Sequence, residues 1–271
     1  MVTYAAFRTG STAVHRAIRA ASSTVAVKAH ALAPRHLSSR RGDRFRDRRA
    51  EDAVPISFHV GDWVVRRAIL EPRRRADFVV LLREPVAVAA SLFAGGREWW
   101  APGLAALVDR AVAAGERLDD RAVALAAASL EERVPATLMR DWLRHDLAPS
   151  LEIDPLAVAF DRRRGAGVVE QGPWRILLLR SDLPDGRKQA ELSAFLGRAI
   201  PPPSRRNATA DAAPWVRLAM SLARRAVASR TFLVDRLLDE AFVARFWSPE
   251  EVGAIRRSWR PRVPPALPVP T

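Results

Sequence analysis

The sequence predicts an α/β fold, a three-layer sandwich in which helices flank a central parallel sheet. The chain opens with a run of strand composition at residues 2–7 and passes through a turn into a helical pattern at 13–18. A second strand pattern follows at 24–30, and a strand–helix–strand unit of this length indicates a parallel pair. Continuous apolar runs at 76–82 and 174–180 are typical of strands buried inside such a sheet.

Length and proline content predict one domain, one extension and a tail. With 271 residues, 49% of them hydrophobic, the chain is long enough to bury one large core. We expect residues 1–200 to form the α/β domain. Three consecutive prolines at 201–203 begin a helical C-terminal extension that is expected to span 201–260 and to pack on that domain. Residues 261–271 form a Pro-rich tail.

The composition argues against several classes of function. The chain has no Cys, which rules out disulfides, thiolate catalysis and Cys-ligated metal. No secretion signal and no apolar run of about 20 residues is visible, so we expect a soluble, cytoplasmic protein without a membrane span. The formal net charge is +14, and Arg carries nearly all of it because Lys28 and Lys188 are the only lysines. A charge of this size favours polyanionic ligands.

The turn at residues 8–12, Arg-Thr-Gly-Ser-Thr, is the first candidate site. A strand that passes through Gly and hydroxyl residues into a helix points several backbone N–H groups at one place, where the helix dipole also favours an anion. Arg8 adds a cation, and Ser11 and Thr12 add hydroxyl donors for phosphate or sulfate oxygens. The turn is P-loop-like, although the pattern GxxxxGK[ST] is absent; Ser or Thr acting only as a helix cap is the alternative.

The ends of the next strands carry further candidates. His30 follows the second strand and is a candidate general base, because an ordinary imidazole pKa of about 6.5 suits proton transfer near neutrality. His59 is the rival for this role, and a structural or surface histidine is the alternative for either. Arg83 ends the strand at 76–82, and the helix that follows Pro85 carries Ser91. Residues placed in this way can converge on a second phosphate.

These residues together resemble the sulfotransferases that use 3′-phosphoadenosine 5′-phosphosulfate (PAPS). The resemblance implies that the first turn holds the 5′-phosphosulfate and that an Arg and a Ser at this separation hold the 3′-phosphate. The matching residues are Arg8, Thr9, Gly10, Ser11 and Thr12 for the first role, and Arg83 and Ser91 for the second. The segment Lys28-Ala29-His30 is similar to the family's Lys-Thr-His element, whose His is the general base.

A closer resemblance, to the sulfotransferase-like bacterial family of capsular polysaccharide synthesis proteins, extends through nearly the whole chain. It is carried by an ordered series of short motifs in the second half. These are Ile153-Asp154, Phe160-Asp161, the run from Leu179 to Leu183, the run from Phe246 to Glu251, and Trp259. The chain departs from the family at Arg8, where many relatives have Lys, and after Asn207, where the family's Tyr and Lys residues are missing.

The resemblance implies a PAPS-dependent enzyme that transfers a sulfuryl group to a hydroxyl or amine of a carbohydrate, such as a capsular polysaccharide. His30, or else His59, would accept the proton, and Arg8 would offset charge on the bridging oxygen. No metal is required, and no His/Asp cluster with ligand spacing is visible. Two alternatives remain, a basic nucleic-acid-binding protein and a sulfotransferase fold that has lost catalysis.

Further expectations concern local structure. Residues 56–61 have the composition of a short strand or turn, and the helix at 139–147 is expected to stop before Ala148-Pro149. The segment 155–167 is expected to form a hairpin turn or loop. Asp182 is expected to be a supporting residue that fixes its loop. Candidates to line an acceptor site, with core or lid anchors as the alternative, are Trp99, Trp100 and Trp142.

Overall fold

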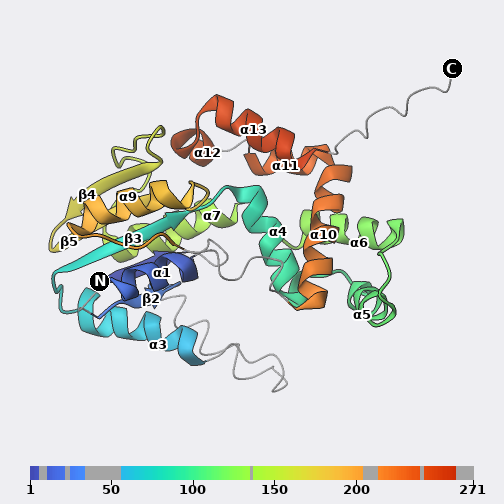
Figure 1. Cartoon of the computed structure of the whole chain (residues 1–271), viewed down its shortest axis with the longest axis horizontal. Helices are drawn as coiled ribbons and strands as arrows, with labels where there is room; N and C mark the ends of the chain where they lie inside the picture. The colour runs from blue at the N-terminus through green and yellow to red at the C-terminus, as the bar shows by residue number, and fades with distance from the viewer. Residues whose placement is uncertain are drawn as a thin grey trace.

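The computed structural model describes residues 1–5, 11–21, 25–33, 56–134, 137–203, 213–238 and 241–260, and leaves out the side chains at 56–59, 138 and 231. Within these residues the chain forms a five-stranded sheet with helices on both faces. A further group of helices packs beyond the end of the sheet (Figure 1).

The sheet has the strand order β2-β1-β3-β5-β4. Its strands are β1 (Val2–Ala5), β2 (Val27–Ala29), β3 (Ala76–Leu82), β4 (Ala166–Gln171) and β5 (Trp174–Arg180). β1 pairs in parallel with β2 and β3, and β3 pairs in parallel with β5. Among the described strands only β4, at the edge, is antiparallel. The predicted α/β arrangement of a central sheet flanked by helices is confirmed, and the sheet is mostly, though not entirely, parallel.

Side chains alternate along each strand, so the sheet contributes to two separate cores. Val79 and Leu81 of β3 face α1 (Ser11–Ala20) and α9 (Asp185–Leu196), whose apolar residues complete the smaller core. Phe78 and Val80 point to the opposite face and join the larger core, to which Val65 of α3 (Ile56–Val65) also belongs. The result is helices, sheet and helices in three layers.

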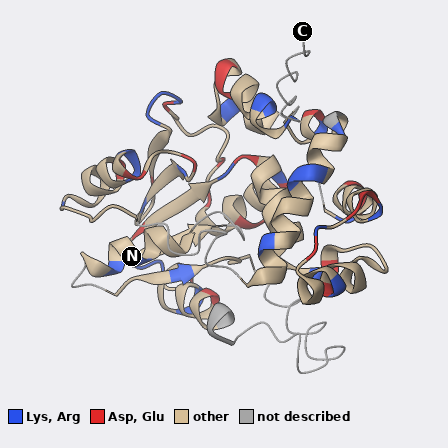
Figure 2. Ribbon diagram, turned by 45° about the vertical axis from the view of Figure 1, so that its right-hand side comes forward, with Lys and Arg blue, Asp and Glu red and all other residues tan. Residues whose placement is uncertain are grey.

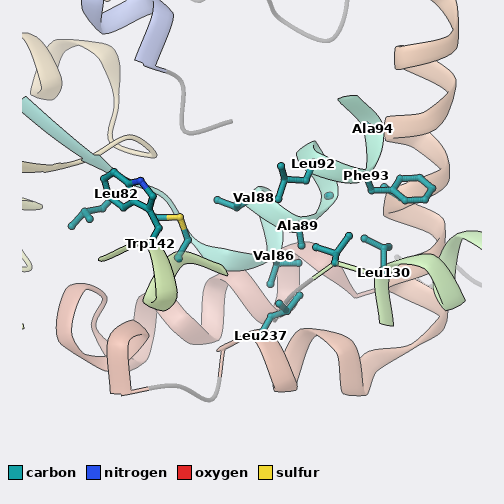
Figure 3. Close-up of a cluster of buried hydrophobic side chains, with 14 of the residues drawn as sticks. Leu82, Val86, Val88, Ala89, Leu92, Phe93, Ala94, Leu130, Trp142 and Leu237 are labelled. Atoms are coloured by element: carbon teal, nitrogen blue, oxygen red, sulfur yellow. The ribbon is translucent and has the colours of Figure 1, made fainter. Parts of the chain in front are cut away.

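The helix α4 (Pro85–Gly95) follows β3 and lies at the centre of the larger core, where Figure 3 shows Leu130 and Leu237 facing it from two other helices. α10 (Pro214–Ser229) packs across α4 and α6 (Asp120–Glu132). α5 (Leu104–Ala114) and α11 (Thr231–Leu238) complete the group. The described C-terminal helices therefore share one core with residues that precede the prolines at 201–203.

Two short helices, α12 (Ala241–Phe246) and α13 (Pro249–Trp259), end the described part of the chain. α13 begins with a capping box, in which the Ser248 side chain accepts from the Glu251 N–H and the Glu251 side chain accepts from the Ser248 N–H. The tail at 261–271 lies outside the described residues. Of the helices that the structure describes, none combines the length and apolar character needed to cross a membrane.

Two local predictions were wrong. Residues 56–61 belong to α3, because packing of the helix against β2 outweighs the strand-like composition. The helix expected to stop before Pro149 continues as α7 (Leu138–Trp142), the π-helical turn η4 (Leu143–Leu147) and α8 (Ala148–Leu151). Pro149 is tolerated because it falls in the first turn of α8, directly after the wider turn of η4.

The strand β4 was not predicted. The expected turn is present, since Gly165 has a φ of 70° and its N–H donates to the Asp161 carbonyl. β4 begins directly after it and lies at the edge of the sheet, paired with β5. Edge strands of this kind bury little, and Val168 in its middle is 48% exposed, so the segment lacks a buried-strand pattern.

Candidate functional site

The carboxyl ends of β1, β2, β3 and β5 meet at one edge of the sheet because these strands are parallel. β1 lies between β2 and β3. The chain passes from β1 to β2 on one side and then forms β3 on the other side of β1. Such a switch in strand order opens a crevice at the strand ends, where α/β proteins bind ligands. Tyr4 is in register with Ala29, and Ala5 with Leu81, so the end of β1 lies between His30 and Arg83 along this edge.

The predicted anion turn, residues 8–12, follows β1 in the sequence. Arg8, Thr9 and Gly10 lie outside the described residues, as does the side chain of His59. Ser11 and Thr12 are the first two residues of α1, and Ser11 is buried. The N-terminal end of α1 therefore lies at the predicted site, and there a helix has a positive dipole and N–H groups without partners within the helix.

Lys28 of β2 reaches the start of α1, where its Nζ donates to Thr12 Oγ1 at 2.9 Å. Burial, and to a lesser extent the charge of Arg16, lowers the pKa of Lys28 from its ordinary value. Sequence reasoning noticed this lysine only as part of the Lys-Ala-His segment. The structure adds its ammonium group to the positive end of α1, which increases the attraction of that place for an anion.

His15 lies on the same side of the sheet, with its Nδ1 3.4 Å from Thr3 Oγ1. Burial, and to a lesser extent the charges of Lys28 and Arg19, lowers the pKa of His15 to about 4. The ring is therefore neutral at neutral pH. His15 adds no charge beneath the start of α1.

His30 follows β2 directly and is 4% exposed. Its Nδ1 lies 2.8 Å from the Ala5 carbonyl oxygen, the last residue of β1. Because a carbonyl only accepts, Nδ1 carries the proton of the neutral ring and Nε2 carries the lone pair. This tautomer is the one that a general base acting through Nε2 requires.

The residues around His30 hold its backbone from several sides. Asp62 Oδ1 accepts from the N–H of His30 at 2.6 Å and from that of Ala31 at 3.2 Å. The Trp142 indole donates to the His30 carbonyl at 3.0 Å. Asp146 Oδ1 accepts from the Leu32 N–H at 2.8 Å and from the Tyr4 hydroxyl. We call His30, Asp62, Trp142 and Asp146 the His30 corner.

Sequence reasoning missed Asp62 and Asp146, which are both fully buried. For Asp62, the preceding residue, Gly61, was a sequence feature that could have indicated close packing at this place. A Cβ on Gly61 would lie 2.1 Å from the Lys28 carbonyl oxygen, so only glycine allows α3 to approach β2 so closely. That approach brings Asp62 under the His30 N–H. Asp146 had no such signal, since its contacts depend on the π-helical turn η4.

Arg83 and Ser91 lie on the same strand–turn–helix unit. Arg83 follows β3 directly, Glu84 caps α4, and both Arg83 and Ser91 are partly exposed. Every residue of α4 is buried except Ala87, Ser91 and Gly95, which follow one another at intervals of four residues. Ser91 therefore lies on the one side of α4 that the core does not cover, as the predicted role requires.

Glu84 forms the start of α4 as a buried cap, 7% exposed. Its Oε1 accepts from the Ala87 N–H at 2.8 Å and from the Trp259 indole of α13 at 3.3 Å. Burial raises the pKa of Glu84 to about 7, although the Ala87 N–H, the charge of Arg83 and the Trp259 indole all lower it. A carboxyl group that titrates near neutrality thus lies next to the predicted phosphate ligand.

Two motifs that are about 70 residues apart meet at the end of β5. Arg180 donates through Nε and Nη2 to Asp182 at 3.1 and 2.8 Å, and through Nη1 to both oxygens of Glu251 at 2.7 and 2.8 Å. Its guanidinium carbon lies 5.2 Å from the Trp247 ring, whose indole donates to Asp182. We call these four residues the Arg180 cluster. Asp182 thus fixes the chain after β5.

The buried guanidinium of Arg180 keeps its charge. Burial opposes that charge, but the hydrogen bonds and charges of Asp182 and Glu251 outweigh burial and raise the pKa of Arg180. Because both carboxylates are committed to Arg180, the cluster joins β5 to α13. It does not offer its cation to a ligand in this arrangement.

The three tryptophans considered for an acceptor site are core residues. Trp100 is 4% exposed and donates to the Phe93 carbonyl at 2.7 Å. Trp142 is buried against Tyr4, with ring centroids 5.0 Å apart, and lies beside Leu82 in Figure 3. Trp99 is half-buried and packs on the same core. Packing of these apolar rings in the core, rather than an acceptor site, therefore accounts for their positions.

The positive charge is spread over the described surface, since Figure 2 shows Lys and Arg on many separate helices and strands. Several arginines are paired with acids, as in Arg73–Glu152 and Arg97–Asp109 at 2.5 Å and Arg164–Glu191 at 2.6 Å. Among the described residues, the basic side chains therefore lie on many elements, and a good number of them are already engaged by carboxylates.

No family model, no curated protein and no solved structure matches the chain. In the part of the chain that the structure describes, no group of three or more His, Asp or Glu residues is placed to hold a metal ion.

Proposed function

We propose that the protein is a PAPS-dependent sulfotransferase, which transfers a sulfuryl group to a hydroxyl or amine of a carbohydrate acceptor such as a capsular polysaccharide. The observation that carries the proposal is the order of groups along one sheet edge. The start of α1 contacts Lys28 of β2 through Thr12, His30 follows β2, and Arg83 follows β3, with β1 between these two strands. PAPS carries one anionic group at the 5′ position of its ribose and another at the 3′ position, which suits this arrangement.

The P-loop-like turn after β1 is proposed to bind the 5′-phosphosulfate. The N–H groups at the start of α1 and the hydroxyls of Ser11 and Thr12 would donate to its oxygens, together with Arg8, Thr9 and Gly10. The Lys28 ammonium, 2.9 Å from Thr12 Oγ1, supports an anion there. Arg83 and Ser91 are proposed to bind the 3′-phosphate, with the guanidinium supplying charge and the hydroxyl a further donor.

The proposed reaction is an in-line transfer. The acceptor oxygen or nitrogen forms a bond to sulfur while the bond from sulfur to the bridging oxygen breaks, and adenosine 3′,5′-bisphosphate leaves. His30 Nε2 takes the acceptor's proton, and the Ala5 carbonyl stabilises the resulting imidazolium through Nδ1–H. Arg8 and the N–H groups of the turn offset the charge that develops on the bridging oxygen. His59 remains the second candidate for the base.

The proposal is tested by isothermal titration with adenosine 3′,5′-bisphosphate. Wild type is expected to bind it, and Arg83→Ala is expected to weaken binding at least about tenfold, because a charge-assisted phosphate contact is lost. Arg75→Ala is the matched control, since Arg75 is exposed and precedes β3 at the opposite edge of the sheet. Absence of binding in wild type, or equal binding by both variants, would contradict the proposal.

A further inference from the structure

The helix α13 is tied to the sheet edge at both of its ends. At its N-terminal end Glu251 accepts from Arg180, the last residue of β5, and the capping box with Ser248 fixes the Glu251 side chain. At its C-terminal end the Trp259 indole donates to Glu84 Oε1 at 3.3 Å. Both ties are made by side chains whose partners lie about 70 and 175 residues earlier in the chain.

The two points that α13 joins belong to neighbouring strands. Leu82 at the end of β3 is in register with Arg180 at the end of β5, and the Ser181 N–H donates to the Leu82 carbonyl at 2.7 Å. Arg83 and Glu84 follow Leu82 directly. α13 therefore spans the carboxyl edge from the end of β5 to the start of α4, and Figure 1 shows it above that part of the sheet.

We infer that α13 sets the geometry of the 3′-phosphate subsite, with Glu84 and Trp259 as positioning residues for Arg83. This inference rests on the proposed function. Glu84 follows Arg83 directly and caps α4. The position in which Glu84 is held therefore decides how the backbone leaves β3, and with it the starting point of the Arg83 side chain. Trp259 fixes that cap from outside the sheet.

The hydrogen bonds of Glu84 explain why an anchor is useful. A carboxylate beside a phosphate-binding arginine competes with the phosphate for the guanidinium. In the structure, Glu84 Oε1 accepts hydrogen bonds from both the Ala87 N–H and the Trp259 indole, which holds the carboxylate toward α4. The Arg224 guanidinium carbon lies 5.8 Å from the Trp259 ring and packs against it, so the indole is itself held.

The Arg180 cluster fixes the other end of the helix. Its charged groups are hydrogen-bonded to one another, and the guanidinium of Arg180 lies over the Trp247 ring. Such a network is costly to open because it would leave a buried charge unpaired. With that end immobile, the position of Trp259 is determined by the length of α13, from Pro249 to Trp259.

The test measures how well the protein distinguishes a ligand with a 3′-phosphate from one without it. Trp259→Phe keeps an aromatic ring and removes the indole N–H. We expect it to weaken binding of adenosine 3′,5′-bisphosphate about tenfold, while binding of 5′-AMP, measured by competition, changes less than about twofold. Trp215→Phe is the control, since Trp215 is a half-buried indole of α10 whose ring contacts Trp100.

A second pair of variants separates positioning from charge. Glu84→Gln keeps an oxygen that can accept both hydrogen bonds and is expected to retain the preference for the 3′-phosphate, whereas Glu84→Ala is expected to lose it as Trp259→Phe does. Equal losses for both nucleotides in Trp259→Phe, no loss at all, or a Glu84→Gln protein as weak as Glu84→Ala would overturn the inference. Failure of wild type to bind adenosine 3′,5′-bisphosphate would instead contradict the proposed function.

Discussion

The His30 corner and the Arg180 cluster lie at the same edge of the sheet but hold the chain by different means. In the His30 corner, fully buried carboxylates accept from backbone N–H groups of residues 30–32. In the Arg180 cluster, a buried guanidinium is paired with Asp182 and Glu251, whose side chains are 31% and 37% exposed. The His30 corner fixes the backbone of residues 30–32, whereas the Arg180 cluster fixes α13 against the end of β5.

This difference matches what each region is proposed to do. A general base must keep one tautomer and one orientation; the Ala5 carbonyl selects the tautomer of His30, and the hydrogen bonds to its backbone restrict its orientation. A subsite for a phosphate needs its strand ends and helix start kept in register, and side-chain ion pairs achieve that across a larger distance. We therefore expect changes in the His30 corner to affect turnover and stability most. Changes near α13 are expected to affect binding and pH dependence.

The largest expected effect is that of His30→Gln on turnover. The glutamine amide can still donate to the Ala5 carbonyl, but it cannot accept a proton, so the rate of sulfuryl transfer is expected to fall about 10²–10⁴-fold. His59→Gln is the matched variant, expected to keep most of the activity. The assay follows release of adenosine 3′,5′-bisphosphate with PAPS and a panel of carbohydrate acceptors. Full activity in both variants would show that neither histidine is the base.

Gly61→Ala is expected to break the His30 corner by a purely steric route. Its Cβ would lie 2.1 Å from the Lys28 carbonyl oxygen, so α3 must move away from β2 and Asp62 must leave the backbone of His30. We expect a loss of about 4 kcal/mol in the free energy of unfolding, measured by urea denaturation.

The control for this prediction is a second helical glycine. A Cβ on Gly186, in α9, would meet no atom within 4 Å, so Gly186→Ala is expected to change the free energy of unfolding by less than about 1 kcal/mol. If Gly61→Ala were as stable as Gly186→Ala, close packing of α3 on β2 would not be what holds Asp62 in place.

Glu84 gives the region near α13 a pH dependence. Because burial raises its pKa from 4.5 to about 7, the folded protein keeps a proton between these values that the unfolded chain has lost. The stability of wild type relative to Glu84→Gln is therefore expected to fall by about 3 kcal/mol as the pH rises from 4.5 through 7. Urea denaturation at several pH values measures this difference, and a constant difference would contradict it.

His15 acts in the opposite direction in the same experiment. Its pKa is lowered from 6.5 to about 4, so the unfolded chain binds the extra proton and stability rises with pH between these values. Since His15 is present in both wild type and Glu84→Gln, its contribution cancels in the comparison. The curve of wild type alone combines both groups and is expected to be flatter than either contribution.

Much of the fold followed from patterns that are local in the sequence. The apolar runs at 76–82 and 174–180 predicted β3 and β5, and Pro85 predicted the start of α4. These succeed because burial on both faces of a strand, or capping of a helix, depends mainly on neighbouring residues. The prediction for 56–61 was wrong because close packing on β2 at Gly61 decides that helix, and such packing involves residues far away in the sequence.

For the candidate site, the available chemical groups could be predicted from the sequence: the Arg-Thr-Gly-Ser-Thr segment at residues 8–12, a histidine after one strand, and Arg83 with Ser91 after another. Parallel strands then place these groups at one edge. Only the tertiary structure decided which side chains hold them there, since Asp62, Asp146, Trp142 and Trp259 act on partners 31 to 175 residues away. The physical reason is that a hydrogen bond needs its two atoms about 3 Å apart, and separation along the chain carries no information about that distance.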